Sequence, residues 1–213
     1  MNMNILVIGN GVVESTEIIK EYSGISDLII CADGGAGYLY KIGIKPHILV
    51  GDFDSIDPEV KRFYNDSGIE IVQFPRQKDY TDMELALDIA VEKGAKKIFI
   101  AGATGSRLDH TLSNIQLLHK LADAGVEGII VNSNNYIHLL TDHMELTKKE
   151  GFYLSLVPAT PRVEGITTKG LAYPLKDAEM VMGTGLGISN EFISDKAEVT
   201  VKKGRLYVIV SRD

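Results

Sequence analysis

The chain has 213 residues, of which 45% are hydrophobic and 24% charged, a composition typical of soluble globular proteins. A formal charge of −7 argues against a general nucleic-acid-binding protein. No apolar run is long enough to span a bilayer, and the N-terminus lacks the pattern of a signal peptide. The single cysteine, Cys31, excludes an internal disulfide, so we expect a cytoplasmic protein.

From the N-terminus to Ser133, short apolar runs alternate with helical patterns. The predicted strands cover residues 4–9, 27–32, 47–51, 70–74, 96–101 and 128–131, and the predicted helices cover residues 14–21, 36–42, 58–65, 81–93 and 109–124. The strands are continuous runs of Ile, Leu and Val, as expected for a parallel sheet covered by helices on both faces. Residues 1–133 are therefore predicted to form a doubly wound α/β domain with a mostly parallel sheet.

After Ser133 the pattern changes to short β-rich segments separated by Gly, Pro, Asn and Asp. Strands are predicted at residues 136–140, 152–158 and 165–168. Residues 197–211 are predicted to form a β-hairpin that turns at Lys203 and Gly204. Residues 134–213 are therefore predicted to form a second, small all-β domain.

Acidic and glycine-rich motifs follow four of the predicted strands. They read CADGGAG after the second strand, GDFDS after the third, KDYTD after the fourth and GATGSRLDH after the fifth. Ligands of open parallel sheets bind at the carboxyl ends of the strands. The four motifs are therefore expected to meet in one ligand site.

The GDFDS motif favours a magnesium site. In an extended backbone, Asp52 and Asp54 would point the same way while Phe53 turns back into the core. Paired carboxylates suit Mg²⁺ that also binds substrate phosphates. The alternative is a solvated turn with no ligand.

The next two motifs could contribute charges to the same site. Asp82 lies in the first turn of a helix that begins with a capping box at Thr81 and Glu84, so its carboxylate either binds a ligand or only favours the helix terminus. In GATGSRLDH, the small residues allow a phosphate to approach the backbone, Arg107 supplies a planar donor fork and Asp109 adds a carboxylate. The segment GNGVVE lacks the third glycine of a dinucleotide-binding fingerprint.

The order ADGGA, GDFDS, KDYTDMELAL, GATGSRLDH and then GISNEF resembles the thiamine pyrophosphokinase family, over residues 31–192. The resemblance implies an α/β catalytic domain followed by a β-sandwich domain that binds thiamine. It also implies transfer of the diphosphate of ATP to the hydroxyl of thiamine, which yields thiamine diphosphate and AMP. The family works with Mg²⁺ as a homodimer with shared active sites.

Site residues follow from the same resemblance, position by position. Asp52, Asp54 and Asp82 would hold Mg²⁺, and catalysis would rest on these three with Arg107 and Asp109. The ATP site would contain Asp33, Gly34, Gly35, Lys78, Thr104 and Arg107. Ser189, Asn190 and Tyr173 would meet thiamine. Ser106 stands where many relatives have a glycine, and Tyr173 where they often have Trp, so Tyr173 would supply the stacking face.

Two other functions fit parts of the pattern. Carboxylate clusters at strand ends also serve Mg²⁺-dependent nucleotide phosphohydrolases, which need no platform for a second substrate. A non-enzymatic nucleotide sensor, whose β domain binds a partner, would turn over nothing. Incubation with ATP and Mg²⁺, with and without thiamine, distinguishes the three.

Overall fold

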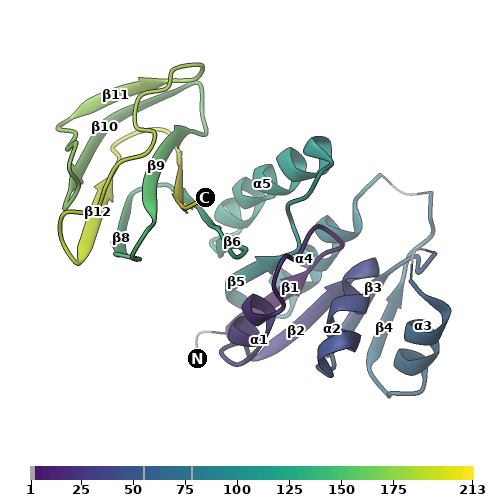
Figure 1. The fold of residues 1–213 in the computed structure, drawn as a ribbon. Coiled ribbons are helices and arrows are strands. Elements are labelled where there is room, and N and C mark those ends of the chain that lie inside the picture. Colours follow the sequence, from purple (N-terminus) through teal and green to yellow (C-terminus); the bar gives the residue numbers. More distant parts are fainter. Residues whose placement is uncertain (1–2, 55, 78) are drawn as a thin grey trace. The chain divides into compact units, whose positions relative to one another are not determined.

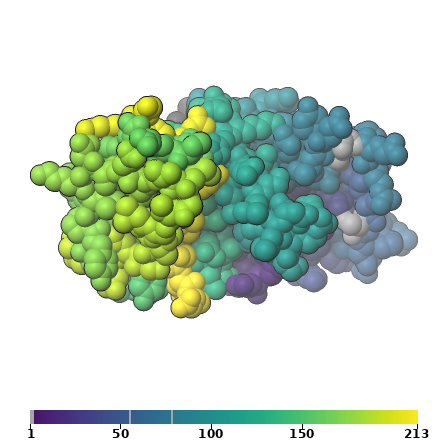
Figure 2. Space-filling view, turned by 90° about the horizontal axis from the view of Figure 1, so that it is seen from above, coloured from purple at the N-terminus to yellow at the C-terminus, as the bar shows by residue number. Residues whose placement is uncertain are grey.

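The chain divides into two compact units, Met1–Ser133 and Asn134–Asp213. The computed structural model describes residues 3–54, 56–77 and 79–213. Figure 1 shows the elements of each unit along the chain, and Figure 2 shows one face of both units with the second in green to yellow. The division falls where the sequence pattern changes.

The first unit alternates strands and helices. Its strands are β1 (Met3–Ile8), β2 (Leu28–Ala32), β3 (Ile48–Gly51), β4 (Glu70–Gln73), β5 (Ala95–Ala101) and β6 (Glu127–Val131). Its helices are α1 (Glu17–Ser23), α2 (Ala36–Ile42), α3 (Pro58–Asn65), α4 (Asp82–Glu92) and α5 (Leu108–Asp123), with a 3₁₀ turn at Asp33–Gly35. Among the described residues, no helix has the length and apolarity that crossing a bilayer requires.

The strands of the first unit pair in the order β4-β3-β2-β1-β5-β6, and every adjacent pair is parallel. The chain builds outward from β1 to β4 and then returns to the other side of β1 with β5. Because parallel crossovers are right-handed, this reversal places the later helices on the opposite face of the sheet from the earlier ones. The predicted doubly wound α/β fold is confirmed, and the strand order reverses between β1 and β5.

Local sequence signals determine where two of the helices begin. The side chain of Asp57 accepts a hydrogen bond from the Glu59 amide (2.8 Å), and Pro58 follows in the first turn of α3. Thr81 caps α4 by accepting from the Glu84 amide (3.1 Å). The predicted cap at Thr81 is confirmed, and Asp57 with Pro58 at the start of α3 follows the same local chemistry.

Helix α1 begins three residues later than expected, at Glu17 instead of Glu14. The residues before it form a loop, in which the Val12 amide donates to the Thr104 carbonyl (2.7 Å) and the Glu17 amide donates to Oγ of Ser15 (3.3 Å). The local bond at Ser15 coincides with the observed start of the helix.

The central strands carry the core of the first unit. Ile5, Leu6, Val7 and Ile8 of β1 are all fully buried, as the unbroken apolar run predicts. Cys31 of β2 is also fully buried, and burial raises the pKa of its thiol. The cysteine therefore remains a protonated core residue.

The second unit is a sandwich of antiparallel strands. Its strands are β7 (Asn135–Leu140), β8 (His143–Thr147), β9 (Tyr153–Pro158), β10 (Arg162–Lys169), β11 (Ala178–Val181), β12 (Lys196–Thr200) and β13 (Leu206–Ser211). One layer has the order β7-β13-β9 and the other β11-β10-β12-β8. Their facing side chains form one buried apolar cluster that includes Leu154, Ile166 and Val208. The predicted all-β sandwich is confirmed.

The predicted hairpin over residues 197–211 is wrong. Strand β12 pairs with β10 and β8, whereas β13 pairs with β7 and β9, so the two strands belong to different layers. The segment between them crosses from one layer to the other, and Lys203 there bridges to Glu164. Gly204 has φ +88°, as a hairpin turn would require, but it turns the chain into the opposite sheet.

Candidate functional site

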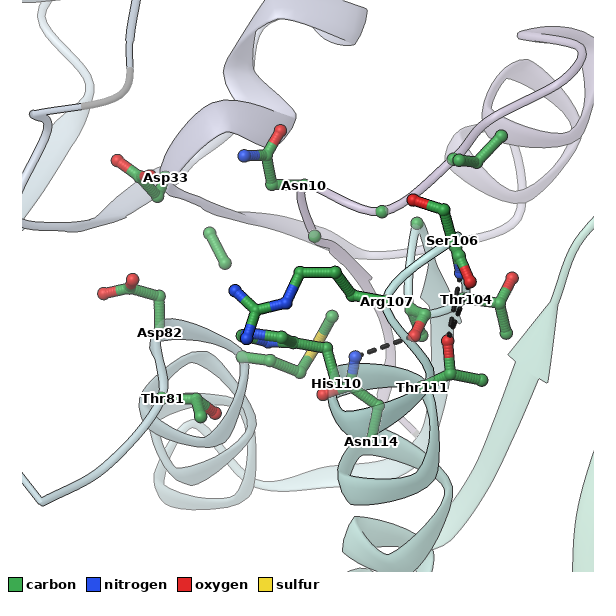
Figure 3. Close-up of a pocket in the computed structure, with 18 residues that line it drawn as sticks. Asn10, Asp33, Thr81, Asp82, Thr104, Ser106, Arg107, His110, Thr111 and Asn114 are labelled. Carbon is green, nitrogen blue, oxygen red and sulfur yellow. Dashed lines mark hydrogen bonds between the residues drawn. The ribbon is translucent and has the colours of Figure 1, made fainter.

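A pocket of about 500 Å³ lies at the carboxyl ends of the strands of the first unit, where the strand order reverses. Its walls come from the loops after β1, β2 and β5 and from the first turns of α4 and α5 (Figure 3). The lining residues are Gly9–Val12, Ala32, Asp33, Thr81–Met83, Gly102–Arg107, His110, Thr111 and Asn114. The predicted residues Asp33, Asp82, Thr104 and Arg107 therefore share one cavity.

The floor of this pocket is made of backbone. Three hydrogen bonds continue the pairing of β1 with β5 into the loops, from the amides of Gly9, Gly11 and Val12 to the carbonyls of Ala101 (2.9 Å), Gly102 (2.7 Å) and Thr104 (2.7 Å). A Cβ atom on Gly102 would overlap the Gly9 carbonyl oxygen, and one on Gly11 would lie 2.5 Å from the Gly102 oxygen. Only glycines permit two loops to lie this close.

Sequence analysis missed the first of these loops. The segment from Gly9 to Gly11 lacks the third glycine of a dinucleotide-binding fingerprint, so that motif does not assign it to the site. A glycine pair directly after the first strand, at the edge where ligands bind, was the available signal.

Three carboxylates from neighbouring strand ends meet beside the pocket. Asp33, Asp52 and Asp54 each offer an oxygen atom, and these atoms lie within 4.8 Å of one another. Asp33 is only 9% exposed. Gly51 allows this approach, because a Cβ at that position would lie 3.1 Å from the Cβ of Asp33. Hard carboxylate oxygens in such a cluster fit a divalent cation such as Mg²⁺.

The backbone of the GDFDS motif differs from the expected one. Phe53 is buried, as predicted, but its φ is +62°, which is left-handed rather than extended. The turn is closed by a hydrogen bond from the Asp54 amide to Oδ1 of Asp52 (3.1 Å). The two carboxylates therefore converge through a tight turn and not through strand alternation.

Asp82, which the resemblance also gives to the metal site, is not part of this three-carboxylate cluster. The cluster within 4.8 Å contains Asp33 in its place. Asp82 lies in the first turn of α4 and faces the same side of the pocket as Asp33 (Figure 3). Asp33 thus connects the carboxylate cluster to the pocket that Asp82 lines.

Arg107 is the cation of the pocket, and Asp109 holds it. Asp109 does not line the cavity; it accepts hydrogen bonds from Nε (3.2 Å) and Nη2 (2.5 Å) of Arg107. These bonds lower the pKa of the Asp109 carboxyl and raise that of the Arg107 guanidinium. Both side chains are largely exposed, so the pair orients Arg107 more than it stabilises the fold.

Side chains of α5 and of Asn132, directly after β6, hold the loop that carries Thr104. Asn114 donates to the Ala103 carbonyl (2.7 Å), and the Gly105 amide donates to Oγ1 of Thr111 (3.1 Å) (Figure 3). Thr104 Oγ1 accepts a hydrogen bond from Asn132 (3.1 Å). These hydrogen bonds fix the conformation of the loop after β5 that lines the pocket.

Gly34 and Gly35, which are also predicted for the ATP site, lie behind Asp33 in the chain. Gly34 and Gly35 belong to the 3₁₀ turn after β2 and do not line the cavity. A Cβ on Gly35 would lie 2.8 Å from the Ile8 carbonyl oxygen, so this glycine allows the turn to pack on the end of β1. Lys78 lies outside the described residues.

A smaller pocket of about 230 Å³ lies in the second unit. It is lined by Leu156, Tyr173, Leu175, Gly185–Ile188 and Asn190. Tyr173 is 69% exposed and Ile188 is 52% exposed, so apolar surface surrounds its opening. Two of the three residues predicted to meet thiamine, Tyr173 and Asn190, line this pocket.

The Asn190 side chain binds the main chain. Its Oδ1 accepts from the amides of Tyr173 (3.0 Å) and Glu191 (2.9 Å), and its Nδ2 donates to the Tyr173 carbonyl (2.7 Å). The residue is 6% exposed. Ser189, which is exposed and has φ +56°, does not line the pocket. Asn190 thus positions Tyr173 at the pocket wall.

Comparison with known proteins finds matches to both units. The family model described as thiamin pyrophosphokinase, catalytic domain, matches residues 19–130, and the model described as thiamin pyrophosphokinase, vitamin B1 binding domain, matches residues 141–206. The thiamine pyrophosphokinase of Bacillus subtilis is 34% identical to this chain. The match covers 92% of this chain and 94% of the relative.

Solved structures agree. The crystal structure of thiamine pyrophosphokinase from Bacillus subtilis superposes with a TM-score of 0.89 at 33% identity, and 99% of each chain is covered. The thiamin pyrophosphokinase structure from Geobacillus thermodenitrificans gives a TM-score of 0.86 at 32% identity and covers 99% of this chain and 98% of that one. None of these relatives is named as a phosphohydrolase, so the hydrolase alternative finds no support.

Proposed function

The chain belongs to the thiamine pyrophosphokinase family, and we propose that it carries out that family's reaction at the pocket of the first unit, with ATP and Mg²⁺. The reaction class is the transfer of diphosphate to thiamine. The observation that carries the assignment of the site is the meeting of Asp33, Asp82 and Arg107 in one cavity beside a three-carboxylate cluster.

Asp33, Asp52 and Asp54 would hold the metal ion, and Asp82 would face it from α4. When bound, Mg²⁺ neutralises charge on the phosphates of ATP. Three carboxylates close together repel one another, which is why a site of this kind favours a divalent cation. Their donor set of hard oxygens suits Mg²⁺ better than softer metals.

The residues of the chain orient the two reactants. The hydroxyl oxygen of thiamine forms a bond to the β-phosphorus, the bond from that phosphorus to the bridging oxygen of AMP breaks, and the hydroxyl proton leaves. Arg107, held by Asp109, faces the charge that develops on the phosphate oxygens. The glycine floor lets the phosphates approach backbone atoms closely.

The second unit would bind thiamine. Its pocket offers an exposed aromatic face, Tyr173, which can stack on a planar ring. Ser189 lies next to this pocket in the chain and would supply a hydroxyl group. We further propose that the protein is a cytoplasmic homodimer in which residues of both chains complete each active site.

A product assay tests the reaction. With ATP, Mg²⁺ and thiamine, AMP and thiamine diphosphate should form in a one-to-one ratio. Omission of thiamine should leave ATP intact. Accumulation of ADP with thiamine monophosphate would contradict diphosphate transfer, and release of nucleotide product without thiamine would indicate a hydrolase.

A further inference from the structure

Asn10 presents a side-chain amide to the main pocket from the loop after β1. It lines the cavity, it is exposed, and Figure 3 shows the amide directed toward the side of Asp33. No hydrogen bond joins Asn10 to another residue within residues 3–54, 56–77 and 79–213. The other labelled asparagine of the pocket, Asn114, is bonded to the Ala103 carbonyl. Asn10 therefore has its full hydrogen-bonding capacity available to a ligand.

The backbone around Asn10 is held by hydrogen bonds, and its side chain lies against Gly34. The residues on either side of it, Gly9 and Gly11, donate their amides to the carbonyls of Ala101 and Gly102. The side-chain amide lies against Gly34. A Cβ atom added to Gly34 would lie 2.5 Å from Nδ2 of Asn10 and would overlap the other amide atoms. A side chain at position 34 would therefore displace the Asn10 amide from this position. Such a group is pre-organised for binding.

The chemistry around Asn10 indicates what it binds. Gly34 directly follows Asp33, which belongs both to the pocket and to the carboxylate cluster. A cationic side chain at position 10 would form an ion pair with these carboxylates, and an acidic one would add to their repulsion. A neutral amide supplies an N–H donor beside the cluster, and it neither forms an ion pair with the carboxylates nor repels them. Phosphates that share a metal ion with the cluster would offer acceptor oxygens to that donor.

We propose that Nδ2 of Asn10 donates a hydrogen bond to the β,γ-diphosphate of bound ATP, the group that is transferred. The inference rests on the proposed function, but it concerns a residue outside the range that the catalytic-domain model matches, residues 19–130. It makes Asn10 a substrate-positioning residue at the backbone floor of the site.

Calorimetric titration with ATP and with AMP, in Mg²⁺ and without thiamine, tests the proposal. Asn10→Ala should weaken ATP binding about tenfold, because a hydrogen bond to a charged phosphate is lost. AMP lacks the β,γ-diphosphate and should bind both proteins equally. Asn10→Asp should weaken ATP more than Asn10→Ala does. The melting temperature of Asn10→Ala should equal that of the wild type, since no intramolecular bond is removed.

A second variant tests the contact with Gly34. Gly34→Ala should displace the amide and weaken ATP binding, whereas the same change in the Asn10→Ala protein should weaken it much less, a coupling that a double-mutant cycle measures. Equal ATP affinity of wild type and Asn10→Ala, or an equal loss for AMP, would overturn the inference. Failure of the wild-type protein to bind ATP at all would instead refute the proposed function.

Discussion

Left-handed backbone conformations of non-glycine residues concentrate at the candidate sites. Within the described part of the chain they occur at Asp33, Phe53, Asp177 and Ser189. Asp33 and Phe53 shape the carboxylate cluster, and Ser189 precedes the residue that positions Tyr173. Each such conformation costs about 1–3 kcal/mol, so surrounding contacts must impose it. At Phe53, burial of the ring supplies that compensation and directs the two flanking carboxylates toward Asp33.

The metal cluster gives a prediction with a control three residues away. Asp54→Asn should lower turnover at least about a hundredfold, since a metal ligand is lost, while the free energy of unfolding stays the same or rises because repulsion among three carboxylates falls. Asp57→Asn should change neither quantity, since asparagine caps α3 as well as aspartate does. Steady-state kinetics and urea unfolding measure both. Near-normal turnover of Asp54→Asn would remove this residue from the metal site.

Asn190 gives a second prediction about a single residue. Asn190→Ala removes three hydrogen bonds that the buried Asn190 side chain makes to the main chain of Tyr173 and Glu191, so we expect a loss of about 2–3 kcal/mol in stability. The thiamine KM should rise as well, because Tyr173 is no longer held. Ser189→Ala should leave the stability unchanged. An unchanged unfolding midpoint of Asn190→Ala, with only the thiamine KM raised, would indicate direct contact with thiamine instead.

At the scale of elements, the loops after β1 and β5 behave as one structure. Their hydrogen bonds extend the strand pairing past Ile8 and Ala101, and the glycines bring the two backbones into contact. The floor of the pocket is therefore hydrogen-bonded as a continuation of the sheet. This pairing sets the backbone positions of the loops that carry Asn10 and Thr104.

A pair of glycine substitutions tests this floor. Gly102→Ala combines a φ of +61° with overlap of the Gly9 carbonyl, so it should cost more than about 2 kcal/mol of stability and weaken ATP binding. Gly43→Ala has a similar φ, +69°, but open space around the added Cβ, and should cost only about 1 kcal/mol with ATP binding unchanged. Urea unfolding and calorimetry compare the two. Equal losses of stability in the two variants would mean that backbone strain alone, without the steric overlap, acts at Gly102.

At the scale of the whole molecule, the two units contain different parts of the site. The main pocket and the carboxylate cluster belong to Met1–Ser133, and the pocket with Tyr173 belongs to Asn134–Asp213. The second unit has apolar surface exposed at Leu186 and Ile188 around its pocket. The proposed homodimer would combine a nucleotide pocket of one chain with a thiamine pocket of its partner.

Complementation between inactive chains tests that arrangement. Asp54→Asn and Tyr173→Ala chains with different affinity tags are refolded together, and mixed dimers are purified through both tags. If sites are shared, one site collects both lesions and the other is intact, so a mixed dimer should show about half of the wild-type turnover. Tyr173→Ala is preferred to an Asn190 variant because Tyr173 is exposed and its loss should not affect folding. Inactive mixed dimers would place each complete site within one chain.

The amino-acid sequence by itself determined the fold class of both units, most element positions, the caps of α3 and α4 and the four motifs at strand ends. These properties depend on local patterns: apolar runs define buried parallel strands, and capping depends on residues two or three positions apart. The order of the motifs was enough to identify the family, because several weak signals in a defined order are specific together.

Only the tertiary structure decided which of these residues meet. Asp33 joins Asp52 and Asp54 because the register pairs Ala32 with Val50, and Gly51 leaves room for the contact. The loop at Asn10 reaches the pocket because β1 lies beside β5. Strands β12 and β13 separate into two layers, although the residues between them allow a hairpin turn. Each of these outcomes depends on contacts between segments distant in the chain, and a local sequence pattern carries no information about such partners.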